Sequence, residues 1–486
     1  MEDYDSHILA KLFTDATGMN AETITRLPGA GSNRRYYRLT SGNKSLIGVA
    51  GKVVAENEAF IYLSRHFAEK GLPVPKVYAV SIDRMHYIQD DLGDTALFDL
   101  IKSGRTTGKW DINEIEALRQ TVKALPLIQW QGAEGLDFDK CYPIPAMDRT
   151  SVMWDLNYFK YCFLKSSGIE IDEPELESDF ERFTSMLLSH NTDTFMYRDF
   201  QSRNVMFDKS GHPWFIDFQG GRRGPVYYDV ASLLWQAKAR IPSAIREELI
   251  DCYIEASRQY FPVGGKPFRK NLRLFVLFRT LQVLGAYGFR GYIERKPHFL
   301  QSIPDAIDNL KELLTDGLPD LPYMSKLLAQ LVSLEKFSHN SCQPEPGILT
   351  VHVNSFGFKK SGIPDDPTGN GGGYVFDCRA IHNPGRYEQY RQLMGRDREV
   401  IEFLENDGEI THFLKSVFAL VDNSVEHYIK RGFTDLTVSF GCTGGQHRSV
   451  YSAEKLAMHL HEKYPCRVCL SHIEQRIKTV LNPNRE

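Results

Sequence analysis

The stretch YRDFQSRNVMFDKSGHPWFIDFQGGRRGPVYYD, residues 197–229, decides the fold of the larger part of this chain. It predicts a loop that carries Asp199 and Asn204, followed by a two-stranded hairpin, NVMF and WFIDF, that carries Asp217. Phosphoryl transfer needs a carboxylate beside the attacking hydroxyl, and an amide and a second carboxylate that hold Mg²⁺ against the nucleotide phosphates. The stretch therefore predicts a phosphoryl-transfer site.

The same three residues also have a purely structural interpretation. Asp199 would cap a turn, Asn204 would lie in it, and Asp217 would close a strand, all without a ligand. The flanking strands favour the chemical interpretation, because a combined motif in its expected context is seldom a chance match.

Length and composition limit the class of protein. At 486 residues the chain is too long for one core, so two or three domains are expected. Its 42% hydrophobic and 25% charged residues are typical of a soluble globular protein, and its net charge of −4 favours neither a nucleic-acid nor a membrane partner. The N-terminus lacks the pattern of a signal peptide and the cysteines are scattered, so we expect reduced thiols and a cytoplasmic location.

The pattern upstream of residue 197 predicts a small nucleotide-binding lobe. Strands are expected within residues 23–40, 45–51, 72–81 and 85–93, with one helix over residues 56–71. Helical patterns then dominate from residue 97 to residue 314. The apolar segment 272–289 is interrupted by two arginines and reads as a buried helix, not a membrane span.

A polar segment rich in proline, residues 338–347, is the expected domain linker. It would separate a first domain, residues 1–330, from a second, residues 348–480. Strands and helices alternate in the second domain, which predicts a three-layer α/β fold with a mainly parallel sheet.

A glycine turn lies between the first two expected strands. Its backbone N–H groups would cover nucleotide phosphates; the residues concerned are Gly29, Gly31, Ser32 and Asn33. A hairpin turn without a ligand is the structural alternative.

The motifs YRDFQSRN, IDFQ, GPVYYDVASLLW and QDDLGD make the first 330 residues resemble the aminoglycoside phosphotransferase (choline kinase-like) family, especially its amino-sugar kinases. The resemblance implies a bilobal α+β, protein-kinase-like fold that binds ATP and Mg²⁺. It implies that Asp199 orients or deprotonates the substrate hydroxyl and that Asn204 and Asp217 bind the metal. Asp229 would brace the loop, and a hinge that includes Gln89 and Asp91 would face the adenine.

The chain departs from that family pattern at two places. Tyr197 stands where the family usually has a histidine. The expected strand SLIGV lacks the usual phosphate-binding lysine. Lys52, Arg34 and Arg35 are the candidates to replace it. Glu58 is either the partner of such a cation or part of a solvated helix face.

A second phosphate-binding signal lies in GCTGGQHRS, residues 441–449. Loop N–H groups, a helix N-terminus and Arg448 together predict an anion site. The spacing of Cys442 and Arg448 is also that of protein tyrosine phosphatases, where the cysteine is the nucleophile and an acid is required; Asp365 and Asp366 are the candidates. A glycine-rich turn without a ligand is the third interpretation.

Residues 351–476 resemble the C-terminal domain of the RNase adapter protein RapZ, through SFGFKKSGIP, YVFDCRAIHNPG, LMGRDREV and GCTGGQHRSV. The resemblance implies a domain that binds an amino-sugar phosphate and can contact RNA. The residues it places around the phosphosugar are Asp377, Arg379, Asn383, Thr443, Gly444, His447 and Arg448. Acidic and basic residues balance here, so the basic surface typical of RNA binding is not expected.

We therefore expect an ATP- and Mg²⁺-dependent kinase that phosphorylates a small hydroxylated compound, by resemblance a cell-wall amino sugar, joined to a phosphosugar-binding domain. The alternative is a non-catalytic adapter that binds nucleotide, senses a phosphosugar and contacts RNA or protein. The missing strand lysine favours the adapter, and the complete set of Asp199, Asn204 and Asp217 favours the kinase.

Overall fold

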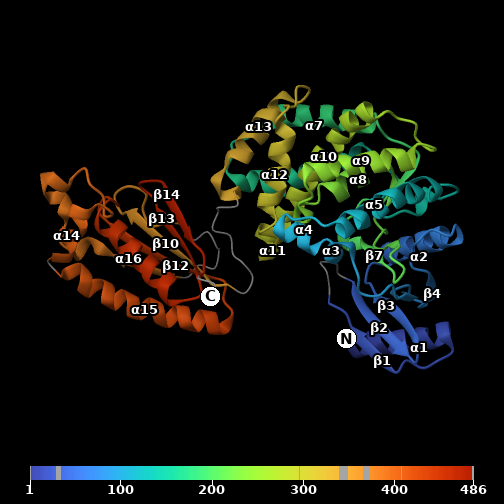
Figure 1. Ribbon diagram of the computed structural model, residues 1–486, viewed down its shortest axis with the longest axis horizontal. Helices are drawn as coiled ribbons and strands as arrows, with labels where there is room; N and C mark the ends of the chain where they lie inside the picture. The colour runs from blue at the N-terminus through green and yellow to red at the C-terminus, as the bar shows by residue number, and fades with distance from the viewer. Residues whose placement is uncertain are drawn as a thin grey trace. The chain divides into compact units, whose positions relative to one another are not determined.

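The structure is a computed structural model that describes residues 2–28, 34–294, 296–338, 348–364, 373–406 and 408–483. The chain divides into two compact units, each described by itself (Figure 1). Unit 1 comprises Met1–Phe289 and Asp305–Ser333, and unit 2 comprises Arg290–Pro304 and Leu334–Glu486. The predicted linker, apart from Ser338, and the glycine turn 29–33 lie outside the described residues, so both stay predictions, as do the domain boundaries.

Unit 1 begins with a five-stranded antiparallel sheet, which confirms the small sheet lobe predicted upstream of residue 97. The strand order is β1-β2-β3-β5-β4. The strands are β1 (Thr23–Arg26), β2 (Arg35–Ser41), β3 (Lys44–Ala50), β4 (Val77–Val80) and β5 (His86–Asp90).

Two helices flank this sheet. Helix α2 (Val54–Glu69) follows β3 as predicted, and its Phe60 stacks on Tyr87 of β5 at 5.3 Å between ring centroids. Helix α1 (Glu2–Thr17) was not predicted. Its Leu9 and Phe13 are fully buried against Leu39 and other apolar side chains of the sheet, so the sheet needs α1 to cover that face.

The remainder of unit 1 is mainly helical, as expected. Its helices are α3 (Leu97–Leu100), α4 (Lys102–Thr107), α5 (Ile112–Pro126), α6 (Arg149–Phe159), α7 (Glu173–Leu188), α8 (Tyr227–Leu234), α9 (Ser243–Ser257), α10 (Gly265–Gly288), α12 (Ile303–Leu314, from Asp305 on) and α13 (Pro322–Ser333).

Helix α10 is the central helix of this part. It packs against α6 and α8, and the apolar segment that extends from it, Gly265–Ile293, is long and apolar enough to cross a membrane. Most of that segment is buried inside the protein, however, which agrees with the predicted core helix. Gly288 lies against the backbone of Cys162, where an added Cβ would be 2.2 Å from the carbonyl oxygen.

The predicted hairpin is present as β7 (Val205–Phe207) and β8 (Pro213–Phe215). A second short pair, β6 (Thr194–Met196) and β9 (Arg222–Gly224), lies on either side of it in the sequence. Strand β8 ends before Asp217, which has a left-handed φ of 67°. The loop after β6 contains Arg198, which has a φ of 75°.

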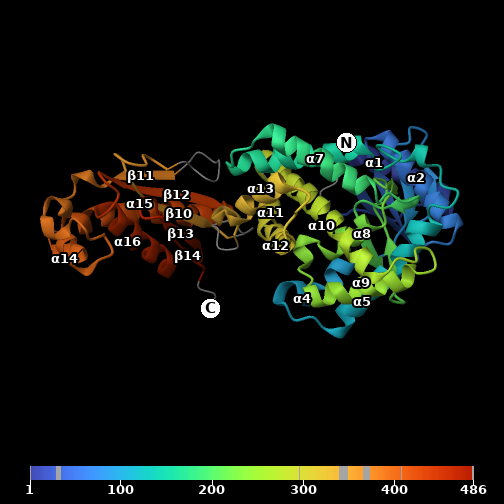
Figure 2. The same ribbon diagram turned by 90° about the horizontal axis from the view of Figure 1, so that it is seen from above.

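Unit 2 contains the predicted mainly parallel sheet, with strand order β11-β12-β10-β13-β14 (Figure 2). Strands β13 and β14 pair antiparallel. The strands are β10 (Thr350–Gly357), β11 (Gly373–Asp377), β12 (Asp435–Cys442), β13 (Arg467–His472) and β14 (Ile477–Leu481). Helices α14 (Arg398–Asn406), α15 (Glu409–Arg431) and α16 (Arg448–Lys463) contribute to its apolar core; the short α11 (Pro297–Leu300) also belongs to this unit.

The cysteines only partly follow the expectation of reduced thiols. Free thiols are present at Cys141, Cys162, Cys252, Cys378, Cys442 and Cys466. Cys469 is disulfide-bonded, so the expectation is wrong for that residue.

Candidate functional site

The structure brings the three predicted phosphoryl-transfer residues together through Asn204. Asn204 Nδ2 donates to the backbone oxygen of Asp199 at 2.8 Å and to Asp217 Oδ2 at 3.4 Å. The loop residue and the residue after the hairpin are therefore held by one amide.

Asp217 has the environment of a metal-binding carboxylate. Burial raises its pKa, and the charge of Asp199 acts in the same direction, against the hydrogen bond from Gln219 and the charge of Arg34. A divalent cation would supply the missing positive charge. Asp217 and Asn204 provide two oxygen ligands, which suits Mg²⁺ because that ion keeps waters and phosphate oxygens as its other ligands. The described residues contain no cluster of three or more His, Cys, Asp or Glu for a metal.

Asp229, at the start of α8, fixes the backbone of the loop that precedes Asp199. Its carboxylate accepts hydrogen bonds from Tyr197 N at 2.9 Å and Arg198 N at 3.0 Å, and from Gln129 Nε2 at 3.3 Å. Burial raises the pKa of Asp229 to about 7, although these hydrogen bonds favour the charged form. Asp229 therefore takes the bracing position that the family resemblance implied.

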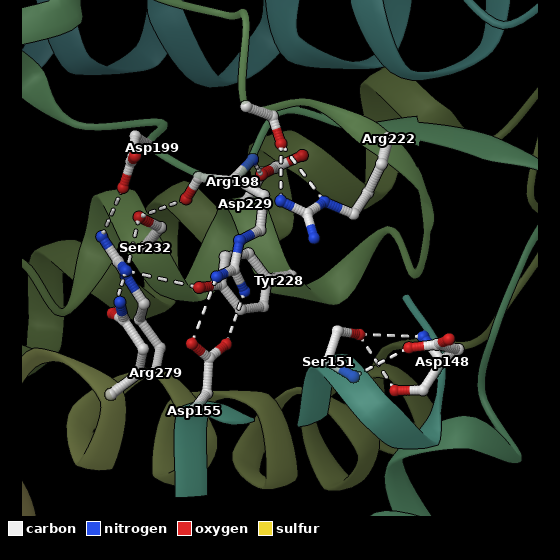
Figure 3. Close-up of polar contacts among 12 residues, drawn as sticks. Asp148, Ser151, Asp155, Arg198, Asp199, Arg222, Tyr228, Asp229, Ser232 and Arg279 are labelled. Atoms are coloured by element: carbon white, nitrogen blue, oxygen red, sulfur yellow. Dashed lines mark hydrogen bonds and ion pairs between the residues drawn. The ribbon is translucent and has the colours of Figure 1, made fainter. Parts of the chain in front are cut away.

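A buried arginine that we did not assign to the site contacts Asp199. Arg279 Nη2 of α10 lies 3.3 Å from Asp199 Oδ1, while the rest of its guanidinium contacts Ser232 and Tyr228 (Figure 3). Asp199 itself is largely exposed, with a side-chain exposure of 56%. The only sequence feature that could have indicated a role for Arg279 is its charge within an otherwise apolar helix.

The loop is also tied to α6. Arg198 forms a two-pronged ion pair with Asp155, at 2.8 and 3.3 Å, beneath the catalytic loop (Figure 3). The Arg198 guanidinium lies 5.1 Å from the centre of the Tyr228 ring. Buried charges need such partners, and this pair holds the residue that precedes Asp199.

The candidates for the missing lysine have different surroundings. Arg35 pairs with Asp5 of α1 at 2.6 Å, and Lys52 is exposed. Arg34 is buried and pairs with Glu56 of α2 at 3.2 Å. Glu58, which we had considered as the acidic partner, lies on the exposed face of α2.

The predicted hinge residues lie at the end of β5. Gln89 is buried, and its side-chain oxygen has no hydrogen-bond partner within the described part of the chain. Asp91 accepts two hydrogen bonds from Arg38, at 2.7 and 3.0 Å. The Asp91 side chain is therefore occupied by Arg38, and the adenine-facing role of this segment stays a prediction.

In unit 2 the predicted anion loop joins β12 to α16. Side chains and loops that follow parallel strands gather at one edge of a sheet, and Asp377 at the end of β11 pairs with Gly441 near the end of β12. Gly444 has open space where a Cβ would be, and Gly445 has a left-handed φ of 68°. The loop thus leaves room beside its backbone for a ligand.

Arg448 does not point into this loop as a free anion ligand. Its Nη1 donates to the carbonyl oxygens of Arg379 and Ile381, at 3.0 and 2.7 Å, and its Nη2 donates to Thr443 Oγ1 at 3.4 Å. Arg448 therefore joins the anion loop to the segment after β11. This structural use was not predicted.

The other predicted phosphosugar residues also have local partners. Asp377 and Arg379 form an exposed ion pair at 2.6 Å. Asn383 caps a short helical turn by accepting from Gly385 N at 3.2 Å. His447 bonds to the carbonyl oxygen of Tyr390 at 2.9 Å, and burial lowers its pKa, so its ring is neutral near pH 7.

Cys442 has some features of a reactive thiol. Burial opposes its ionisation, but hydrogen bonds from Ser449 and from loop N–H groups outweigh that effect and lower its pKa. Gly445 N lies 3.2 Å from its Sγ. The two candidate general acids, Asp365 and Asp366, lie outside the described residues, and Arg448 is bound to carbonyl groups. The phosphatase interpretation gains no support from this geometry.

Comparisons with known proteins agree with both resemblances. Residues 166–264 match the family model of the phosphotransferase enzyme family, and residues 349–476 match that of the RapZ C-terminal domain. Unit 1 thus contains a region similar to the phosphotransferase enzyme family, and unit 2 contains a RapZ C-terminal-like domain with a mostly parallel sheet. This confirms the predicted fold class.

Individual relatives cover only part of the chain. A nucleotide-binding protein of Nitrosomonas europaea is 43% identical over 117 residues, which are 24% of this chain and 38% of that protein. One of Dechloromonas aromatica is 37% identical over 194 residues, and the match spans 38% of this chain and 65% of that protein. The choline kinase LicA from Streptococcus pneumoniae is 15% identical, with a TM-score of 0.43, and covers 64% of this chain and 99% of its own. The chain therefore spans less than two thirds of the length of the two nucleotide-binding proteins.

Proposed function

We propose that unit 1 is an ATP- and Mg²⁺-dependent kinase that phosphorylates a hydroxyl group of a small substrate of the amino-sugar class. The observation that carries this proposal is the single Asn204 amide that joins the backbone of Asp199 to the carboxylate of Asp217. The residue proposed as base and the residue proposed as metal ligand both contact the Asn204 side chain, so they lie close together, as phosphoryl transfer requires.

Each residue has a separate part in the proposed reaction. The exposed carboxylate of Asp199 accepts or orients the proton of the substrate hydroxyl, and Arg279 holds that carboxylate in place at 3.3 Å. Asn204 and Asp217 would hold Mg²⁺, which neutralises charge on the phosphate oxygens when it is bound. Asp229 keeps the loop backbone rigid, so the base does not need to be ordered during the reaction.

For unit 2 we propose a binding site for a phosphorylated amino sugar at the loop between β12 and α16. Its support is the open backbone at Gly444, the helix N-terminus at Arg448 and the resemblance to the RapZ C-terminal domain. The site would bind the product of unit 1 or a related phosphosugar. RNA binding is not part of this proposal.

The kinase proposal is tested by phosphate transfer from ATP to a panel of amino sugars, with Asp199→Asn compared with the wild type. We expect the variant to lose about 10²–10⁴-fold in kcat, the usual contribution of a general base. Asp193→Asn is the matched control, because Asp193 is an exposed carboxylate just before β6. Equal transfer by the wild type and Asp199→Asn would contradict the proposal.

The adapter remains the second candidate, because the phosphate-binding lysine that the family resemblance implies within SLIGV, residues 45–49, is missing. It predicts binding of MgATP without transfer to any sugar. The same assay distinguishes the two functions when it is combined with calorimetric measurement of MgATP binding.

A further inference from the structure

Strand β3 carries Lys44 at its start, but one of its two faces has no cation. It pairs with β2 so that Tyr36 lies opposite Val49. Side chains alternate across a strand, and Tyr37 and Leu39 face α1, so Tyr36 and Val49 lie on the other face. The side chains of β3 on that face are Ser45, Ile47 and Val49, and none of them is charged.

Arg34 lies on this same face, one residue before β2 and two before Tyr36. Its side chain has an exposure of only 4%, and its Nη2 lies 3.2 Å from Glu56 Oε1. The same nitrogen donates to the Glu56 backbone oxygen at 3.4 Å, and the guanidinium lies 6.0 Å from the centre of the Phe60 ring. A buried cation of the sheet is therefore anchored to the first turn of α2.

The Phe60 ring beside the Arg34 guanidinium stacks on Phe218, the residue that follows Asp217, at 4.8 Å between ring centroids. The charge of Arg34 lowers the pKa of Asp217, and the charge of Asp217 raises the pKa of Arg34 in return. Burial opposes the charge of Arg34, but its neighbours Tyr87, Tyr36, Glu56 and Asp217 outweigh that effect. A buried positive charge thus lies beside Asp217, where nucleotide phosphates and Mg²⁺ would meet.

We propose that Arg34 is the phosphate-contacting cation of this site, and that it replaces from β2 the lysine expected on β3. Glu56 is its positioning residue. The assignment rests on the proposed function, because it assumes that nucleotide phosphates bind in this cleft. The planar guanidinium offers several donors in a fixed fork, so it contacts phosphate oxygens while one prong stays with Glu56.

The test is calorimetric titration of the full-length protein with MgATP, together with the sugar phosphorylation assay. We expect Arg34→Met to weaken MgATP binding about 10–100-fold, because a hydrogen bond to a charged group contributes roughly 1.5–3 kcal/mol and each 1.4 kcal/mol is tenfold. Adding Val49→Lys to Arg34→Met places a cation on β3 and should restore most of the affinity. Glu58→Gln, an exposed position on the same helix, is the matched control and should bind as the wild type does.

Thermal unfolding of each variant identifies those that fold. Wild-type affinity in a folded Arg34→Met variant would overturn the assignment. If that variant does not fold, Arg34→Gln decides, because it keeps a polar side chain and removes the charge: weaker MgATP binding supports the role of Arg34 and unchanged binding refutes it.

Failure of this assignment differs from failure of the proposed function. If the wild type binds MgATP, Arg34→Met does not and no sugar is phosphorylated, then Arg34 keeps its role and the kinase proposal fails. If transfer occurs and neither transfer nor binding responds to Arg34→Met, the kinase proposal stands and the Arg34 assignment fails. A wild type that binds no MgATP refutes both.

Discussion

Asp229 is a buried carboxylate that stabilises the backbone of the loop before Asp199. It satisfies the backbone N–H groups of Tyr197 and Arg198, and Arg198 has a left-handed φ that a residue with a side chain adopts at a cost. Both N–H groups would be left without these partners if the carboxylate were removed. The backbone conformation before Asp199 therefore depends on a side chain that is fully buried.

We predict that Asp229→Ala lowers the free energy of unfolding of unit 1 by about 2–4 kcal/mol, because buried donors lose their acceptors. Urea denaturation followed by tryptophan fluorescence measures the change. Asp193→Ala is the control at an exposed carboxylate and should change it little. A loss for Asp229→Ala no larger than that of the control would show that the loop is held by other contacts.

Helix α10 is the element on which the candidate active site depends most. It provides Arg279, and it approaches the segment after α6 so closely that only glycine fits at Gly288. An added Cβ there would be 2.2 Å from the Cys162 carbonyl oxygen, and backbone atoms cannot move aside as a flexible side chain can. Close packing therefore requires glycine at position 288, although glycine has a low helix propensity.

Gly288→Ala is expected to destabilise unit 1 by about 1–3 kcal/mol, the usual cost of overpacking, although alanine favours a helix more than glycine does. Gly265→Ala in the same helix is the control. Its Cβ would meet only the end of the Arg269 side chain at 3.0 Å, which can move. Thermal unfolding of the two variants gives the comparison, and a Gly288→Ala protein as stable as Gly265→Ala would refute the close contact.

At the scale of the whole molecule, two compact units contain the two phosphate-related sites that we propose. Unit 1 is discontinuous, because Arg290–Pro304 is assigned to unit 2. Compact units with their own cores generally unfold as separate transitions. A ligand raises the stability of the unit that binds it.

Calorimetry of the full chain should therefore show two unfolding transitions. MgATP should raise the Tm of one, and glucosamine 6-phosphate, as a probe amino-sugar phosphate, should raise the Tm of the other. At a ligand concentration of about 100 times Kd the stabilisation is roughly 2.7 kcal/mol, which is readily measured. A single transition that both ligands shift equally would contradict this arrangement.

The sequence predicted the parts of the site that are close in the chain. Asp199, Asn204 and Asp217 are separated by 5 and 13 residues, and a loop and a hairpin are enough to place them. The contacts of Arg34 with Glu56 and of Arg279 with Asp199 join residues 22 and 80 apart, so they depend on how helices pack. Helix α1 was missed although Leu9, Leu12 and Phe13 have helical spacing, because nothing in the sequence shows which sheet face needs cover.

Because β3 has Val49 and no lysine on this face, the choice of reagent decides whether the proposed nucleotide site can be labelled covalently. Covalent nucleotide analogues with an amine-reactive group depend on a nucleophilic lysine beside the phosphates. A guanidinium is protonated at all physiological pH values and does not react in that way. Chemical profiling with such analogues would therefore pass over Arg34, and a survey of ATP-binding proteins made by that route would undercount proteins of this design.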